Sequence, residues 1–168
     1  MKTLFIIRHA KSSWDNTDLS DFERPLNDRG RRDAPRMAKR LKEKSAHPDL
    51  MLSSPAKRAL STCKRFAEVL GYPKEKIKTD RDLYHADEEE ILSVVRRVSD
   101  KYHTVMFFGH NPGLTYFANS LNRNELKNIS NIPTCGVVSF SFDVESWNRV
   151  EFGNGKFLFF DYPRSKDD

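Results

Sequence analysis

The sequence is poor in cysteine and lacks any long apolar run. Cys63 and Cys135 are its only cysteines. Neither belongs to a Cys-X-X-Cys pair or has a histidine at ligand spacing, which argues against a zinc site and a disulfide framework. We expect two buried, reduced thiols in a cytoplasmic protein. No apolar stretch reaches the roughly 20 residues that span a membrane, and the first residues enter a strand-like segment rather than a signal peptide.

Charge, in contrast, is abundant and slightly basic. The 168 residues include 29 Lys and Arg against 24 Asp and Glu, a net charge of +5, with a pI of about 9.2. A basic balance suits nucleic acid, a membrane surface or acidic small molecules. The basic residues are spread along the chain, however, and the densest group, residues 29–44, is interpreted as a solvated helix face. Because no basic and aromatic stripe is present, we expect neither nucleic acid nor a membrane as a partner.

The chain contains no internal repeat and no low-complexity linker. Its length predicts a single domain over residues 1–163, followed by a loose tail at 164–168. Short apolar runs alternate with helical patterns, which favours an α/β fold: a three-layer α/β/α sandwich with a mostly parallel central sheet. Strands are expected at 4–7, 50–52, 76–79, 105–108, 137–142 and 157–160.

Capping residues mark the expected helix starts. Helices are predicted to begin after Asn27 or Asp28, after Ser54-Pro55, after Asp87 and after Asn111-Pro112. Pro35 conflicts with the first of these starts, since proline lacks an N–H and clashes one turn back. We expect either a kink at that residue or a helix that begins near Arg32.

Basic and imidazole side chains follow three of the predicted strands. Arg8-His9 closes the first, Ser54 to Arg58 the second, and Gly109-His110 the third. In an open α/β sheet, ligands bind at the carboxyl ends of the strands. Two arginines and two histidines can therefore converge on one point, although any one of them alone is more often structural.

Such a set suits a phosphoryl group. Guanidinium groups meet phosphoryl oxygens with paired, fixed donors, and a neutral imidazole is a competent nucleophile. Arg58 is also expected in the first turn of a helix, where free N–H groups favour anions. The long polar loop at 11–26 comes straight after the first strand, a position that is often functional.

Five motifs together resemble those of the histidine phosphatase superfamily, in particular its small branch typified by the SixA-type bacterial phosphohistidine phosphatase. The resemblance implies a phosphoglycerate mutase-like fold and a phosphatase that uses no metal and no cofactor. In chain order the motifs are Arg8-His9-Ala10-Lys11, Arg24-Pro25-Leu26 with Gly30, Ser53-Ser54-Pro55 with Arg58, Leu83-Tyr84-His85-Ala86, and Gly109-His110-Asn111-Pro112-Gly113.

The resemblance also implies a role for each site residue. His9 would attack phosphorus and become a phosphohistidine, which water then hydrolyses. Arg8, Arg58 and His110 would hold the transferred group. Apart from the resemblance, Lys11, Arg24 and Lys57 are expected to form a basic rim around an open site, suited to an acidic partner surface, with Lys11 and Arg24 as substrate-binding residues. Ala10 stands where the superfamily usually has glycine, so we expect that its backbone is not left-handed.

The sequence does not identify the general acid that would protonate the leaving group. Larger members of the superfamily carry a glutamate, or an aspartate after the second histidine, but here Asn111 follows His110. The candidates are His85, Asp87, Glu88, Asp21 and Glu23. A missing strong acid would fit a P–N substrate, because the departing imidazole can take a proton near neutral pH.

Chain length bears on the substrate. Only 51 residues separate Arg58 from His110, too few for a lid domain. An open site suits a phosphorylated protein side chain, such as the phosphohistidine of a signalling domain. A small-molecule phosphomonoesterase remains an alternative, and a non-catalytic phosphate- or nucleic-acid-binding domain is an alternative of another class. The sequence does not decide the oligomeric state.

Overall fold

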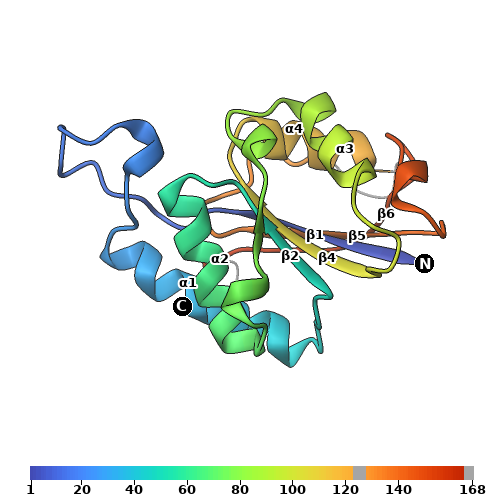
Figure 1. The fold of residues 1–168 in the computed structure, drawn as a ribbon, viewed down its shortest axis with the longest axis horizontal. Coiled ribbons are helices and arrows are strands. Elements are labelled where there is room, and N and C mark those ends of the chain that lie inside the picture. Colours follow the sequence, from blue (N-terminus) through green and yellow to red (C-terminus); the bar gives the residue numbers. More distant parts are fainter. Residues whose placement is uncertain (123–127, 165–168) are drawn as a thin grey trace.

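The computed structural model describes residues 1–122 and 128–164, which form a six-stranded sheet with helices on both faces (Figure 1). The strand order is β3-β2-β4-β1-β5-β6. Strands β3, β2, β4 and β1 are parallel to one another, whereas β5 is antiparallel to both of its neighbours. The strands are β1 (Lys2–Arg8), β2 (Leu50–Ser53), β3 (Lys78–Thr79), β4 (Thr104–Gly109), β5 (Val137–Phe142) and β6 (Lys156–Asp161).

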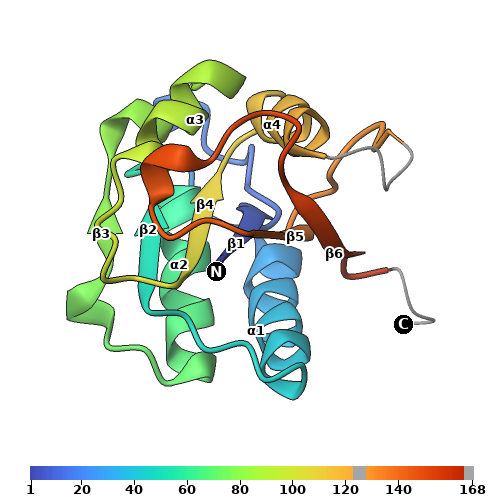
Figure 2. The same ribbon diagram turned by 90° about the vertical axis from the view of Figure 1, so that its right-hand side faces the viewer.

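Four α-helices complete the outer layers. Helices α1 (Asp28–Glu43) and α2 (Lys57–Leu70) cover one face, and α3 (Glu88–Arg96) and α4 (Gly113–Leu121) cover the other (Figure 2). The expected three-layer α/β/α architecture with a mostly parallel sheet is confirmed. Short 3-10 helices lie at η1 (Asp21–Glu23), η2 (Lys74–Lys76), η3 (Arg81–Leu83) and η4 (Trp147–Arg149). Residues 165–168, where most of the expected loose tail falls, lie outside the described residues.

The continuous apolar runs are explained by burial on both faces of the sheet. In β1, Leu4 and Ile6 pack into the core under α3 and α4, while Phe5 and Ile7 pack into the core under α1 and α2. Strand β4 divides its residues in the same way. Because successive side chains of a strand point to opposite faces, a strand covered on both sides needs apolar residues at every position.

The start of α1 after Asn27 is confirmed, whereas α2 and α4 start later than their capping patterns predict. Helix α1 begins at Asp28, with Asn27 accepting a hydrogen bond from Gly30 N, so a start near Arg32 is wrong and Pro35 lies inside the helix. Helix α2 begins at Lys57, two residues after Pro55, because Ser54 turns back to accept from Ala56 N.

Helix α4 also starts later than its capping pattern predicts. It begins at Gly113, and Asn111 Oδ1 accepts from Thr115 N and from Thr115 Oγ1. The cap of α3 is confirmed, since Asp87 and Glu90 form a reciprocal capping box. At α2 and α4 the predicted capping residues, Ser54 and Asn111, do bond to nearby backbone, but Ala56 and Pro112 directly precede the helices.

The sheet brings three strand ends to one place. Arg8 at the end of β1 is paired with Gly109 at the end of β4, and Ser53 at the end of β2 is paired with Phe108. The backbone continues this register, because His9 N donates to Gly109 O at 3.1 Å and Ser54 N donates to Phe108 O at 3.0 Å. The residues that follow β1, β2 and β4 are therefore neighbours at the carboxyl edge of the sheet.

A glycine fixes the chain that leaves β1 against α1. A Cβ placed on Gly30 would lie 2.1 Å from Lys11 O, far inside van der Waals contact, and Lys11 O also accepts from Asn27 N at 3.0 Å. Gly30 thus permits Lys11, two residues after His9, to contact the first turn of α1.

We predict that Gly30→Ala destabilises the protein by about 2 kcal/mol or more, because the neighbouring atom is rigid backbone. Helix propensity alone predicts the opposite sign, a gain of up to about 1 kcal/mol. Urea unfolding measures the difference. Gly71→Ala is the control: its Cβ would meet nothing within 4 Å, but its φ of 74° should cost about 1 kcal/mol. A Gly30→Ala protein as stable as the wild type would contradict the close contact.

Candidate active site

His9 lies buried at the end of β1, held so that one ring nitrogen is left for chemistry. Its Nδ1 lies 2.7 Å from Ala10 O, and only 7% of the residue is exposed. A carbonyl oxygen only accepts, so Nδ1 carries the ring proton and Nε2 keeps its lone pair. Ala10 N in turn donates to Thr62 Oγ1 of α2 at 2.9 Å. As expected, Ala10 is not among the described residues with positive φ.

His110 follows β4 and faces His9, with 5.3 Å between the ring centroids. Its Nε2 lies 2.8 Å from Ser54 Oγ, which already accepts from Ala56 N. The buried hydroxyl hydrogen of Ser54 is satisfied when it is donated to Nε2, since no other acceptor for it is found among the described residues. His110 then carries its proton on Nδ1, a buried atom with no partner in the described chain.

Arg8 and Arg58 supply positive charge beside these rings. Arg8 donates to Ile132 O at 2.9 Å, while its buried Nε has no partner within the described residues. Burial and the charge of Arg58 lower the pKa of Arg8. Arg58 lies in the first turn of α2, as expected, and is almost wholly buried.

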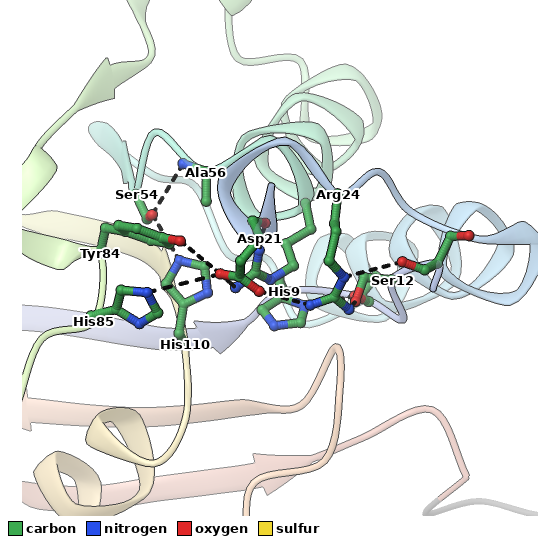
Figure 3. Close-up of polar contacts among 12 residues, drawn as sticks. His9, Ser12, Asp21, Arg24, Ser54, Ala56, Tyr84, His85 and His110 are labelled. Atoms are coloured by element: carbon green, nitrogen blue, oxygen red, sulfur yellow. Dashed lines mark hydrogen bonds and ion pairs between the residues drawn. The ribbon is translucent and has the colours of Figure 1, made fainter. Parts of the chain in front are cut away.

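Asp21, in the loop between β1 and α1, joins the charged groups of the site (Figure 3). Its carboxylate accepts from Arg58 at 3.0 Å, from Arg24 at 2.9 Å and from the hydroxyl of Tyr84 at 2.7 Å. Its carbonyl accepts a second bond from Arg58 at 2.6 Å. Partial burial opposes ionisation, but the bonds from Tyr84, Arg24 and Arg58 outweigh it and lower the pKa of Asp21 well below its usual range. Asp21 is therefore ionised at neutral pH.

Arg24 belongs to the interior of the site and not to an exposed rim. The residue is 7% exposed, donates to Ser13 O at 3.1 Å and to the hydroxyl of Ser12, and stacks on the Trp14 ring at 3.3 Å. The expectation of a rim position was wrong, because the loop folds back and covers the guanidinium. Lys11 is half-buried.

Burial and positive neighbours keep both histidines neutral. Burial, with the charges of Arg58, Arg8 and Arg24, lowers the pKa of His9 to about 3, although the bond to Ala10 O opposes this. Burial and the charges of His9, Arg58 and His85 lower the pKa of His110 to about 3, with Asp21 acting in the other direction. At neutral pH, His9 therefore needs no base to become a nucleophile.

The candidate acids occupy different settings. The His85 side chain is 69% exposed, and its Nε2 lies 3.9 Å from Asp21 Oδ2. Asp87 caps α3, and Glu88 accepts from Ser120 at 2.7 Å. Glu23 is exposed in η1. Only His85 and Asp87 line the cavity next to His110.

Two contributors to this geometry were missed by sequence reasoning. Ser54 was interpreted only as a helix cap, yet it also holds His110. Tyr84 appeared in a motif without a role, yet its hydroxyl binds Asp21 and its ring contacts His110 edge-on at 5.5 Å. Both contacts join residues far apart in the sequence, so the available signal was that each residue belongs to one of the five motifs that resemble the superfamily.

The described part of the chain holds neither a cluster of metal-ligating side chains nor a membrane-spanning helix. Among residues 1–122 and 128–164, no group of three or more His, Cys, Asp or Glu side chains is arranged to hold a metal ion. None of the helices described is long and apolar enough to span a membrane.

Comparison with known proteins gives consistent matches. Residues 4–89 match the family model of the histidine phosphatase superfamily (branch 1). An uncharacterised chloroplast protein of Arabidopsis thaliana is 30% identical over 157 residues, covering 89% of this chain and 70% of that protein.

Solved structures agree over nearly the full length. A SixA structure from Agrobacterium tumefaciens, described as a candidate phosphohistidine phosphatase, superposes with a TM-score of 0.80 at 25% identity, covering 96% of this chain and 98% of that one. The protein histidine phosphatase SixA in complex with tungstate also gives a TM-score of 0.80, at 23% identity and with 96% and 97% coverage. The chain therefore belongs to the histidine phosphatase superfamily, branch 1.

Proposed function

We propose that this protein is a phosphatase that works through a covalent phosphohistidine at His9, and that its substrate is phosphohistidine on a protein. One observation carries the proposal. A neutral, buried His9 presents Nε2 beside arginines, while two buried donors of the same site, Arg8 Nε and His110 Nδ1, have no acceptor in the described chain. Buried donors are rarely left without a partner, so such a pair marks a place for an anion.

The first step is attack on phosphorus. The Nε2 lone pair of His9 forms the new P–N bond, and the bond from phosphorus to the leaving group breaks with its electron pair going to the leaving atom. Arg8, Arg24, Arg58 and His110 hold the three phosphoryl oxygens. Arg58 uses two of its five N–H donors on Asp21, and within residues 1–122 and 128–164 the other three are left for substrate. Positioning and charge stabilisation are the main requirements of phosphoryl transfer.

Asp21 orients the arginines in this scheme and does not act as the acid, because an ionised carboxylate has no proton to give. We assign protonation of an ester leaving group to His85, whose ring lies at the mouth of the site. Lys11, half-buried beside the pair of strand-end residues, would attract the incoming anion.

The second step returns the enzyme to its starting state. A water oxygen bonds to phosphorus, the bond to His9 Nε2 breaks with its electron pair returning to the ring, and phosphate leaves. Three arginines supply the positive charge that a metal ion provides in other phosphatases, so the proposed reaction needs no metal.

Support for a protein substrate comes from the shape of the chain and from its relatives. The segment between Arg58 and His110 is used up by α2, β3, α3 and β4, which leaves the strand ends without a covering domain. The SixA structures are described as a phosphohistidine phosphatase candidate and a protein histidine phosphatase.

We predict that a single turnover with a ³²P-phosphohistidine protein labels the wild type transiently and releases phosphate, with EDTA present. His9→Ala should show no alkali-stable label and at least a thousandfold slower release, because the nucleophile is absent. His103→Ala is the matched control, an exposed histidine just before the start of β4 and away from the carboxyl ends of the strands, and should behave as the wild type.

The remaining outcomes separate the alternatives. Turnover of p-nitrophenyl phosphate alone would favour a small-molecule phosphomonoesterase. No reaction with either substrate would favour a phosphate-binding domain.

We predict that acid weakens the fold through the two buried histidines. In the folded state they stay neutral down to about pH 3, whereas in the unfolded chain they take up protons near pH 6.5. Between these pH values the unfolded state binds more protons than the folded state. Each of the two histidines therefore lowers the free energy of unfolding by roughly 1 kcal/mol for every unit by which the pH is lowered.

Urea unfolding at pH 7 and pH 5 measures this loss. His110→Gln should show a smaller difference between the two pH values than the wild type, and the exposed His47→Gln should show the same difference. A pH dependence unaffected by His110→Gln would contradict the low pKa of that histidine.

A further inference from the structure

A cavity of about 240 Å³ opens beside His110, and its lining residues include neither Arg24 nor Arg58. Its lining includes His85 and Asp87 from the start of α3, and Pro112, Gly113 and Tyr116 from the start of α4. The two chain segments approach closely there, because a Cβ on Gly113 would lie 2.0 Å from Ala86 O. None of these five residues is assigned to hold the phosphoryl oxygens in the proposed mechanism.

We propose that this cavity receives the imidazole ring that leaves a phosphohistidine substrate, and that Asp87 and Tyr116 recognise that ring in its protonated form. The inference rests on the proposed function and adds the part of the site that recognises what phosphorus is attached to. His110 belongs both to the phosphoryl site and to the cavity wall, so a group bonded to a phosphoryl held between His9 and His110 lies at the cavity entrance.

The walls of the cavity suit a flat ring. Tyr116 is 58% exposed on the first turn of α4, an unusual degree of exposure for a large aromatic side chain. The His85 ring also lines the cavity; it contacts Tyr84 in a tilted arrangement with 3.9 Å between the ring centroids, and Tyr84 in turn is fixed by its bond to Asp21. Figure 3 shows His85, Tyr84 and His110 gathered on one side of Asp21. A ring bound in this cavity would therefore have the aromatic side chains of both Tyr116 and His85 in its lining.

The charge of the cavity suits a protonated ring. Asp87 Oδ1 accepts from Glu90 N at 2.8 Å, and Oδ2 accepts no hydrogen bond from the described residues. A carboxylate oxygen that faces a cavity is a strong acceptor for the N–H of a cationic imidazole.

In a phosphorylated imidazole, a proton on the ring nitrogen that is not bonded to phosphorus removes the need for a general acid to protonate the leaving group. When the P–N bond breaks, its electron pair stays on the departing ring nitrogen, the other nitrogen keeps its proton, and the ring leaves as neutral imidazole. An ester, by contrast, leaves as an alkoxide that must gain a proton. A P–N substrate therefore fits a site in which Asp21, bonded to Arg24 and Arg58, is held ionised and cannot donate a proton.

The volume of the cavity favours a single protein side chain over a whole metabolite. Small-molecule sites usually occupy roughly 300–1,000 Å³. The cavity is smaller than that range and is open to solvent on one side, so it fits one ring whose carrier protein stays outside.

The test compares two P–N substrates that differ only in the presence of a ring: phosphoimidazole and phosphoramidate, whose leaving group is ammonia. Asp87→Asn keeps a helix-capping side chain and removes only the charge. We expect it to lower kcat/KM for phosphoimidazole roughly tenfold and to leave phosphoramidate unchanged. Tyr116→Ala should show the same selective loss. The exposed Asp143→Asn is the matched control and should change neither value.

Equal effects of the variants on both substrates, or no effect on either, would overturn the leaving-group cavity. In that case, turnover of phosphoramidate with label on His9 would leave the proposed function intact. Failure of the wild type on both substrates, with no label on His9, would overturn the proposed function and this inference together.

Discussion

The pairing of Asp21 with the arginines is the interaction on which the rest of the site depends. Arg24 and Arg58 are buried within reach of each other, and both donate to the same carboxylate. Buried cations repel one another and lose hydration, so they need a compensating anion. Asp21 provides that anion without consuming all guanidinium donors. It also holds Tyr84, which orients the ring of His85. One carboxylate thus fixes both the cations and the aromatic wall.

The same positive surroundings determine the chemistry of His9. Ordinary imidazole is partly protonated near neutral pH and is then no nucleophile. Burial and the neighbouring guanidinium groups remove the proton, and the contact with Ala10 O decides which nitrogen keeps its lone pair. In the proposed mechanism the arginines therefore serve two purposes: they would hold the phosphoryl group, and their charges disfavour the protonated form of His9.

Much of this arrangement follows from local sequence patterns. Short apolar runs identify β1, β2 and β4, and the rule for parallel sheets then brings Arg8, His9 and His110 to one edge. The contacts of Ser54 and Tyr84 do not follow, because they join segments whose spacing only the folded chain defines. Arg24 illustrates the same limit. Its charge suggested an exposed position, but the loop folds back so that the Trp14 ring stacks on the guanidinium and the residue is buried. Local periodicity predicts elements, whereas hydrogen bonds between distant loops depend on tertiary packing.

The most direct test of the account is a pH titration of the imidazole nitrogens by NMR on protein with ¹⁵N-labelled histidine. The account predicts that His9 stays neutral at pH 5, with its proton on Nδ1 and with Nε2 unprotonated. Titration of His9 near pH 6.5, or a proton on Nε2 in the neutral form, would contradict the claim that the fold prepares this nitrogen for attack on phosphorus.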